Sequence, residues 1–156
     1  MMQDQQHPSS KTVLLTGATG NLGWKLLHHL VSLPGYARFV GLDLRQPDPD
    51  RLAALQQVAQ AAGQQPELQF ITCDLADPHD QAWREAITQA DVIVHFAAQN
   101  PYPEASWGDS AASLDMTLQL ALAAAASQRC QRFVFATSNH VMGRYKDSPR
   151  AEQVAS

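Results

Sequence analysis

Five short apolar runs rich in β-forming residues alternate with four segments whose apolar residues recur at helical spacing. The runs are residues 12–16, 39–44, 68–73, 91–96 and 132–136. The first run is unbroken by charge, as expected of a strand that is covered on both faces. Strands that alternate with helices in this way are typical of a parallel sheet. The chain is therefore predicted to fold as an α/β protein.

The helical segments determine how those strands are connected. We expect helices at about residues 22–31, 51–62, 78–90 and 110–127, with Asp50 and Asp77 as N-caps of the second and third. The last of them carries Leu114, Leu118 and Leu122 on one face. Right-handed crossovers favour the doubly wound strand order 3-2-1-4-5 of the Rossmann fold. In that order the ligand crevice lies outside the carboxyl ends of the strands, between the first and the fourth.

Length and composition fit one domain. The chain has 156 residues, of which 45% are hydrophobic and 17% charged, enough to bury a core. We expect residues 1–10 to be a disordered lead-in and residues 11–156 to form the domain. The formal net charge of −4 argues against nucleic acid as a partner. Two cysteines, no signal peptide and no apolar run of membrane-spanning length predict a cytoplasmic protein without a membrane partner.

The candidate functional residues begin at a glycine-rich turn directly after the first strand. The turn contains Gly17, Thr19, Gly20, Asn21, Leu22 and Gly23. Its glycines allow a sharp turn, a close approach of the backbone to a pyrophosphate, and tight packing of the next helix on the sheet. The N-terminus of that helix offers free N–H groups and a partial positive charge. A turn that is glycine-rich for structural reasons alone is the alternative, but the strand–turn–helix context favours a bound dinucleotide.

Asp43 ends the second strand, about twenty residues after Gly23. An acidic residue at this position accepts hydrogen bonds from the adenosine ribose hydroxyls and repels the 2′-phosphate of NADP. The predicted cofactor is therefore NAD, a preference that Arg45 could soften. The structural alternative is that Asp43 caps the following turn.

Two further strand ends supply candidate cofactor contacts. Asp74 and Leu75 follow the third strand, where Asp74 is expected beside the adenine, with a helix-capping role as the alternative. Ala97 and Ala98 follow the fourth strand, and such small side chains leave room for a cofactor beside the backbone. Simple packing is the alternative for the two alanines.

Together these motifs resemble the extended short-chain dehydrogenase/reductases, a group that includes NAD-dependent sugar epimerases and dehydratases. The resemblance rests on residues 16–23, Asp43, residues 73–75, residues 95–98 and a fifth-strand motif at residues 133–143, and it extends over most of residues 12–147. It implies an NAD-binding Rossmann domain and a small-molecule sugar or sugar-acid substrate. It is also compatible with a homodimer of the full-length protein.

The same resemblance implies roles for residues near the fifth strand. Ser138 matches the active-site serine, whose hydroxyl would hydrogen-bond the reacting oxygen of the substrate. Ser138, Asn139 and His140 are similar to the substrate-contacting segment of uronate dehydrogenases, so Asn139 and His140 would bind sugar hydroxyls or a carboxylate. Asn100, after the fourth strand, is a further candidate for substrate binding. A cap or loop position is the structural alternative for Ser138 and His140.

The catalytic Tyr-x-x-x-Lys pair of that group does not occur in the 156 residues. We therefore expect the chain to be a fragment, truncated before the substrate-binding C-terminal part of the family and inactive alone. The leading hypothesis is an NAD-dependent oxidoreductase acting on a sugar or sugar acid, similar to uronate dehydrogenases. An NAD-dependent sugar epimerase or dehydratase is the first alternative, and a non-catalytic dinucleotide-binding module is the second.

Overall fold

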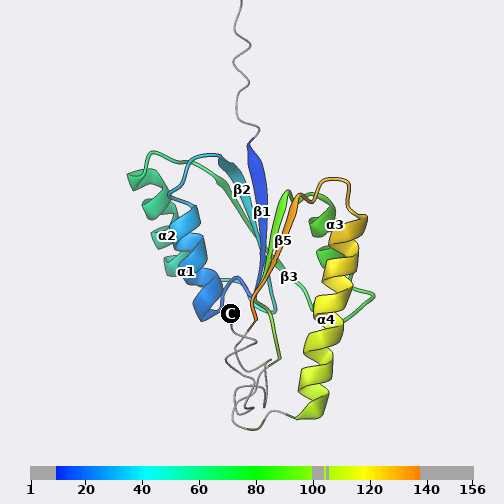
Figure 1. The fold of residues 1–156 in the computed structure, drawn as a ribbon. Helices are drawn as coiled ribbons and strands as arrows, with labels where there is room; N and C mark the ends of the chain where they lie inside the picture. Colours follow the sequence, from blue (N-terminus) through cyan, green and yellow to red (C-terminus); the bar gives the residue numbers. More distant parts are fainter. Residues whose placement is uncertain (1–9, 100–103, 105, 138–156) are drawn as a thin grey trace, which may run out of the picture.

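The architecture is a five-stranded parallel sheet with helices on both faces (Figure 1). The structure, a computed structural model, describes residues 10–99, 104 and 106–137. Within these residues the elements follow the predicted alternation of strand and helix. They are β1 (Lys11–Thr16), α1 (Asn21–Leu30), β2 (Tyr36–Asp43), α2 (Pro49–Ala61), β3 (Glu67–Thr72), α3 (Gln81–Thr88), β4 (Val92–His95), α4 (Trp107–Ala126) and β5 (Arg132–Phe135).

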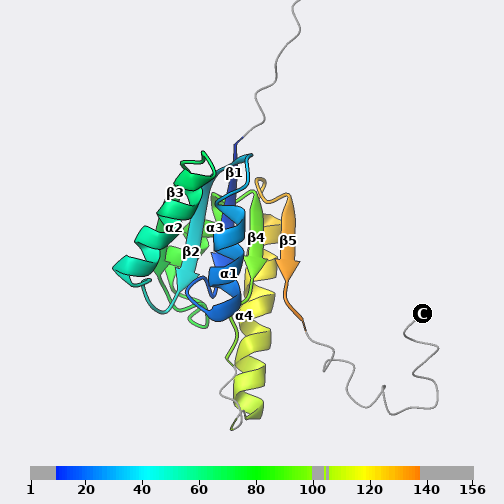
Figure 2. The same cartoon turned by 90° about the vertical axis from the view of Figure 1, so that its left-hand side faces the viewer.

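The order of strands across the sheet is β3-β2-β1-β4-β5, which confirms the predicted doubly wound arrangement (Figure 2). All neighbouring strands are parallel. The last residue of β1, Thr16, is paired with Leu42 of β2 on one side and with His95 of β4 on the other. The carboxyl ends of the strands therefore meet at one edge, and the order reverses between β1 and β4.

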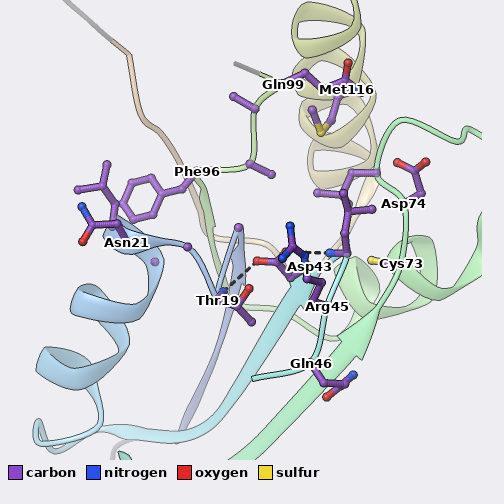
Figure 3. A pocket seen from close by; sticks show the side chains of 18 of the residues that line it. Thr19, Asn21, Asp43, Arg45, Gln46, Cys73, Asp74, Phe96, Gln99 and Met116 are labelled. Atoms are coloured by element: carbon purple, nitrogen blue, oxygen red, sulfur yellow. Dashed lines mark hydrogen bonds between the residues drawn. The ribbon is translucent and has the colours of Figure 1, made fainter. Parts of the chain in front are cut away.

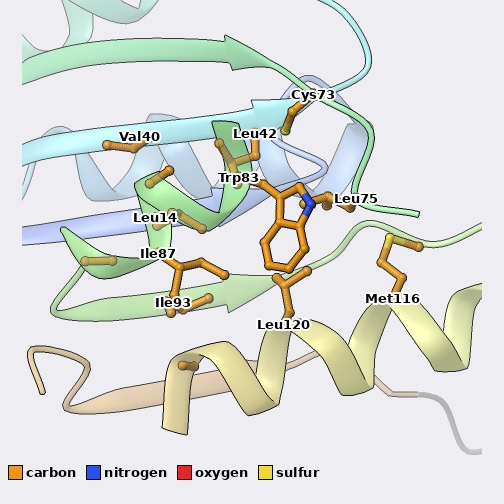
Figure 4. Packing of buried hydrophobic residues seen from close by; sticks show 13 residues of the cluster. Leu14, Val40, Leu42, Cys73, Leu75, Trp83, Ile87, Ile93, Met116 and Leu120 are labelled. Atoms are coloured by element: carbon orange, nitrogen blue, oxygen red, sulfur yellow. The ribbon is translucent and has the colours of Figure 1, made fainter. Parts of the chain in front are cut away.

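The two faces of the sheet have separate apolar cores, because successive residues of a strand point to opposite faces. On the α1–α2 face, Val13 and Leu15 of β1 pack in a cluster with residues of both helices, Leu27 and Leu55. Leu14 points to the opposite face. There it belongs to a cluster of Trp83 from α3 with residues of β2, β4 and α4 (Figure 4). Each face therefore has its own pair of covering helices, as Figure 1 shows.

The start of two helices differs from the prediction. The N-cap of α2 is Asp48 rather than Asp50, because Pro49 already occupies the first helical position, where its missing N–H costs nothing. The N-cap of α3 is Asp80 rather than Asp77, and the Asp80 side chain accepts the backbone N–H of Ala82. Asp77 instead accepts the N–H of His79 in the preceding turn.

Helix α4 buries a face that its leucine spacing does not indicate. Met116, Leu120 and Ala124 are buried against the sheet, whereas the stripe of Leu114, Leu118 and Leu122 is exposed. The helix begins at Trp107 rather than near residue 110, because Ser106 and Asp109 form a reciprocal capping box. Among the described residues, no helix is both long and apolar enough to cross a membrane.

Candidate dinucleotide-binding site

A cleft of about 670 Å³ lies at the carboxyl ends of β1 to β4, where the fold predicts a ligand crevice (Figure 3). Eleven residues expected to contact a cofactor line it. They are Gly17, Thr19, Gly20, Asn21, Leu22, Gly23, Asp43, Asp74, Leu75, Ala97 and Ala98. The structure therefore brings together candidates that are spread over some eighty residues of sequence.

The glycine turn is crowded at two of its three glycines. Gly17 has a φ of +65°, and a Cβ atom there would also lie 3.0 Å from the backbone nitrogen of Ala97. A Cβ on Gly23 would overlap the carbonyl oxygen of Gly17. Gly20 is exposed with an ordinary φ of −70°, and its only such approach among the described residues is 3.2 Å to Gly17 O. Gly17 and Gly23 thus serve the fold, whereas a side chain on Gly20 would mainly obstruct the cleft.

The N-terminus of α1 forms one wall of the cleft. Its N-cap is Gly20, so no described side chain caps the helix, and its first turn contains no acidic residue. Helix α2 likewise has no side-chain cap bond, whereas Asp80 caps α3 and Ser106 caps α4. The first-turn residues Asn21 and Leu22 are exposed at the cleft. Uncapped N–H groups and the helix dipole at this position suit an anionic group such as a pyrophosphate.

Asp43 connects the end of β2 to the glycine turn. Its Oδ2 accepts the backbone N–H of Thr19 at 2.9 Å, and its Oδ1 accepts the N–H of Leu44 at 2.8 Å (Figure 3). The bond to Leu44 is what we would expect if Asp43 only capped the following turn. The bond to Thr19, however, crosses to the glycine turn after β1. Each carboxylate oxygen has capacity for a second hydrogen bond, so Asp43 remains able to accept ribose hydroxyls.

Arg51, in the first turn of α2, is a cleft residue that the sequence analysis missed. Its Nη1 donates to the carbonyl oxygen of Thr19 at 3.2 Å, and its guanidinium lies 4.2 Å from the ring centroid of Trp24. These contacts fix a cation beside the glycine turn. Arg45 also lines the cleft, from an exposed position. A basic residue in the first turn of the helix after β2 was the signal that could have indicated Arg51.

The end of β3 contributes an exposed carboxylate and a buried thiol. Asp74 does not cap α3; its Oδ1 accepts the N–H of Ala76 at 2.9 Å, and its own N–H donates to Asp80. Leu75 is buried and belongs to the core cluster under the cleft. Burial, together with the negative charges of Asp80, Asp43 and Asp74, raises the pKa of the Cys73 thiol to about 12. The thiol of Cys73 is therefore protonated at neutral pH and is not a nucleophile.

The residues that follow β4 form another wall of the cleft. Ala97 and Ala98 lie in this wall with Phe96 and Gln99. The segment is fastened to α4 by a reciprocal pair of bonds, because Gln99 N donates to Ser113 Oγ at 2.9 Å and that hydroxyl donates to Gln99 O at 3.1 Å. The alanines therefore belong to a segment that is fastened to α4.

Four predicted residues lie outside the described part of the chain: Asn100, Ser138, Asn139 and His140. The last described residue is Thr137, directly after Ala136, whose N–H donates to the carbonyl oxygen of His95. The roles of these four residues in substrate binding and catalysis remain predictions.

A doubly wound sheet with a glycine turn after β1 and an acidic residue at the end of β2 defines a Rossmann-type dinucleotide-binding domain. The chain belongs to the NAD dependent epimerase/dehydratase family, whose model matches residues 13–156. Membership confirms the resemblance drawn from the motifs, and it confirms NAD as the cofactor of the family.

Relatives and a solved structure agree with this assignment. The chain is 32% identical over 143 residues to a uronate dehydrogenase of Pseudomonas putida, covering 90% of this chain and 45% of that protein. It is 31% identical to an NAD-dependent glucose-6-phosphate dehydrogenase of Haloferax volcanii, covering 88% and 47%. A short-chain dehydrogenase/reductase superfamily protein from Agrobacterium tumefaciens, solved with bound NAD, superposes with a TM-score of 0.61 and 25% identity, covering 85% and 34%. The chain spans about half the length of the curated relatives it matches.

Proposed function

We propose that this chain binds NAD in the cleft at the carboxyl ends of β1 to β4. The pyrophosphate would lie against the glycine turn and the first turn of α1, and Asp43 would accept the adenosine ribose hydroxyls. One observation carries the proposal: Asp43 Oδ2 bonds Thr19 N at 2.9 Å, so the ribose acceptor and the phosphate turn are held together within one cleft. Gly20 supports it as well, since it is exposed at the cleft and presents backbone where a side chain would obstruct the ligand.

We further propose that the whole protein is an NAD-dependent oxidoreductase acting on a sugar or sugar acid. The uronate dehydrogenase and glucose-6-phosphate dehydrogenase relatives support this substrate class. Bound NAD would supply a hydride acceptor at C4 of its nicotinamide. Ser138 would hydrogen-bond the reacting oxygen, while Asn100, Asn139 and His140 would bind the hydroxyls or carboxylate of the substrate.

Two other functions each have an observation in their favour. The family includes epimerases and dehydratases, so an enzyme that takes up a hydride transiently and returns it is the first alternative. A non-catalytic dinucleotide-binding module is the second, since a Rossmann cleft of this kind needs only its cofactor residues to bind NAD. Both alternatives keep the cofactor site and differ in the fate of the hydride.

Two assays test these proposals in sequence. Calorimetric titration of the 156-residue chain with NAD should give one saturable site, with weaker binding of NADP because Asp43 repels a 2′-phosphate. Absence of saturable NAD binding would contradict the cofactor site.

The full reading frame is then mixed with NAD and galacturonate, glucuronate or glucose 6-phosphate, and the absorbance of NADH is followed. Net NADH formation with one of the acids supports the uronate-dehydrogenase-like function. Conversion of a sugar without net NADH favours the epimerase or dehydratase. A protein that binds NAD but converts none of them would support the non-catalytic module.

A further inference from the structure

His95 lies at the carboxyl end of β4, beneath the cleft rather than among the residues that line it. Its side chain is fully buried, at 0% exposure. Its Nδ1 lies 2.6 Å from Oγ1 of Thr16 on β1, and its Nε2 lies 3.0 Å from Oγ1 of Thr117 on α4. The ring also stacks on Phe135 of β5, with centroids 5.7 Å apart. The imidazole therefore contacts β1, β5 and α4, and these contacts hold the ring in one orientation.

The surrounding hydrogen bonds determine which ring nitrogen carries the proton. Oγ1 of Thr16 accepts the backbone N–H groups of Phe96, at 3.2 Å, and Ala97, at 3.1 Å, so its own proton is left to donate to Nδ1. On the other side, Thr117 donates its hydroxyl to the carbonyl oxygen of Ser113 at 2.8 Å, so its oxygen accepts from the ring. The imidazole is therefore the neutral tautomer with its proton on Nε2.

Thr16 is the link between this ring and the cleft. Phe96 and Ala97 form part of the cleft wall, and the Ala97 backbone packs so closely on the glycine turn that Gly17 has no room for a Cβ atom. The N–H of Phe96 also donates to the carbonyl oxygen of Thr16, at 3.3 Å. Among the described residues, the Ala97 N–H donates to the Thr16 hydroxyl alone. That hydroxyl is therefore the direct contact that holds the Ala97 backbone beside the turn, while the Gln99–Ser113 bonds hold the next residues to α4.

We propose that His95 is a positioning residue for the dinucleotide, acting through the Thr16 hydroxyl, which it orients so that the Ala97 backbone is held against the glycine turn. The inference rests on the proposed binding of NAD in the cleft. A proton added to Nδ1 would direct a third donor at Thr16 Oγ1 and leave the hydroxyl proton without its acceptor. Burial lowers the pKa of His95 to about 4, so the neutral ring persists at physiological pH.

The first test needs no cofactor. Nitrogen-15 NMR of the 156-residue chain should show that Nε2 of His95 carries a proton and Nδ1 does not. The ring should not change its protonation between pH 7 and 5.5. His95→Phe, which removes the signals, provides the assignment. A proton on Nδ1, or a ring that titrates near pH 6.5, would overturn the proposal.

The second test measures NAD affinity by calorimetry. His95→Phe and Thr16→Val should each weaken NAD binding about tenfold, because each breaks the bond that orients the Ala97 wall. The double variant should be no weaker than the weaker-binding single variant, since His95 acts on Ala97 only through the Thr16 hydroxyl that Thr16→Val removes. His95→Asn, which offers an amide oxygen to Thr16, should restore most of the affinity. Leu118→Ala, next to Thr117 but exposed, is the matched control and should bind as wild type.

These outcomes separate the two proposals. A wild-type chain that does not bind NAD contradicts the proposed function, and the positioning role with it. A wild-type chain that binds NAD while His95→Phe, folded by circular dichroism, binds it equally well contradicts the positioning role alone. Fully additive effects of His95→Phe and Thr16→Val would contradict it too.

Discussion

The two faces of the sheet differ in how much of their outer apolar surface is covered. On the α1–α2 face, the large apolar side chains that are exposed among the described residues are Leu22 and Leu44, which line the cleft, and Val134 of the edge strand β5. On the other face, the exposed stripe of α4 leaves Leu118 at 53% exposure, and the edge strand β5 leaves Phe135 at 50%. The amino-terminal turns of α4, starting at Trp107, also extend past the carboxyl ends of the strands (Figures 1 and 2).

This difference matches the division between the two proposed parts of the site. The groups proposed for NAD come from β1 to β4 and the first turns of α1 and α2. Among the described residues there, the large exposed apolar side chains are the two at the cleft. Most of the residues proposed for substrate chemistry, Ser138 among them, follow β5, where apolar surface is exposed, whereas Asn100 follows β4. Cofactor binding should therefore depend on the covered side and tolerate change on the exposed stripe of α4.

The largest contrast is expected within α4 itself. Leu120 is fully buried, so Leu120→Ala should lower the free energy of unfolding by about 2 to 5 kcal/mol. Leu118 lies two residues away on the exposed stripe, and Leu118→Ala should change it by no more than about 0.5 kcal/mol. Urea denaturation of both variants measures the contrast. Equal losses would show that the exposed stripe is covered in solution.

The pH dependence of stability tests the burial of His95 on the α3–α4 face. Burial lowers the pKa of His95 from 6.5 to about 4 in the folded chain, so the unfolded chain takes up the proton first. Stability is therefore full above about pH 6.5 and falls as the pH drops toward 4, by at most about 3 kcal/mol. Denaturation curves between pH 7 and 5 measure the slope. His95→Phe should flatten it, and an unchanged slope in that variant would contradict the assignment.

Gly20→Val tests the covered side at the cleft. The added side chain occupies the space proposed for the pyrophosphate, so NAD affinity should fall by about a hundredfold, or nearly 3 kcal/mol. The free energy of unfolding should change much less, because Gly20 is exposed and has an ordinary φ. Fluorescence titration with NADH measures the affinity. Gly20→Val with wild-type affinity would remove the glycine turn from the site.

The smallest effect is expected from Asp43→Asn. The amide keeps one oxygen for hydrogen bonding but loses the negative charge, so NAD should bind about threefold to tenfold more weakly. NADP should bind more tightly than it does to the wild type, because the repulsion of its 2′-phosphate is removed and Arg45 and Arg51 remain at the cleft. Parallel titrations with both cofactors measure the ratio. A ratio that does not move would show that Asp43 is only a turn residue.

The strand order and the cofactor candidates could be predicted because each depends on local pattern and general topology. Apolar runs, a glycine turn and an aspartate at a strand end are visible in one stretch of sequence. Right-handed crossovers then bring Gly17, Asp43 and Ala97 to one edge. The eleven residues named for the cofactor line the cleft for this reason.

Features that depend on long-range contacts were not predictable in the same way. The leucine spacing of α4 groups Leu114 with Leu118, but this alanine-rich helix has apolar residues on more than one side, so spacing does not indicate which face is buried. Arg51 becomes a cleft residue through contacts with Thr19 and Trp24, thirty-two residues from the first of these. The bond between His95 and Thr16 joins residues 79 apart in sequence, and no local pattern marks it.

The location of bound NAD is the most direct test of the central claim, which is that the covered side holds a complete dinucleotide site. Amide chemical shifts of the 156-residue chain are followed by NMR as NAD is added. Saturable changes should concentrate at residues 17–23, Asp43, and Ala97 with its neighbours, while Leu114 to Leu122 on the outer stripe of α4 change little. Changes centred on that stripe or on β5, or no saturable change at all, would contradict the claim.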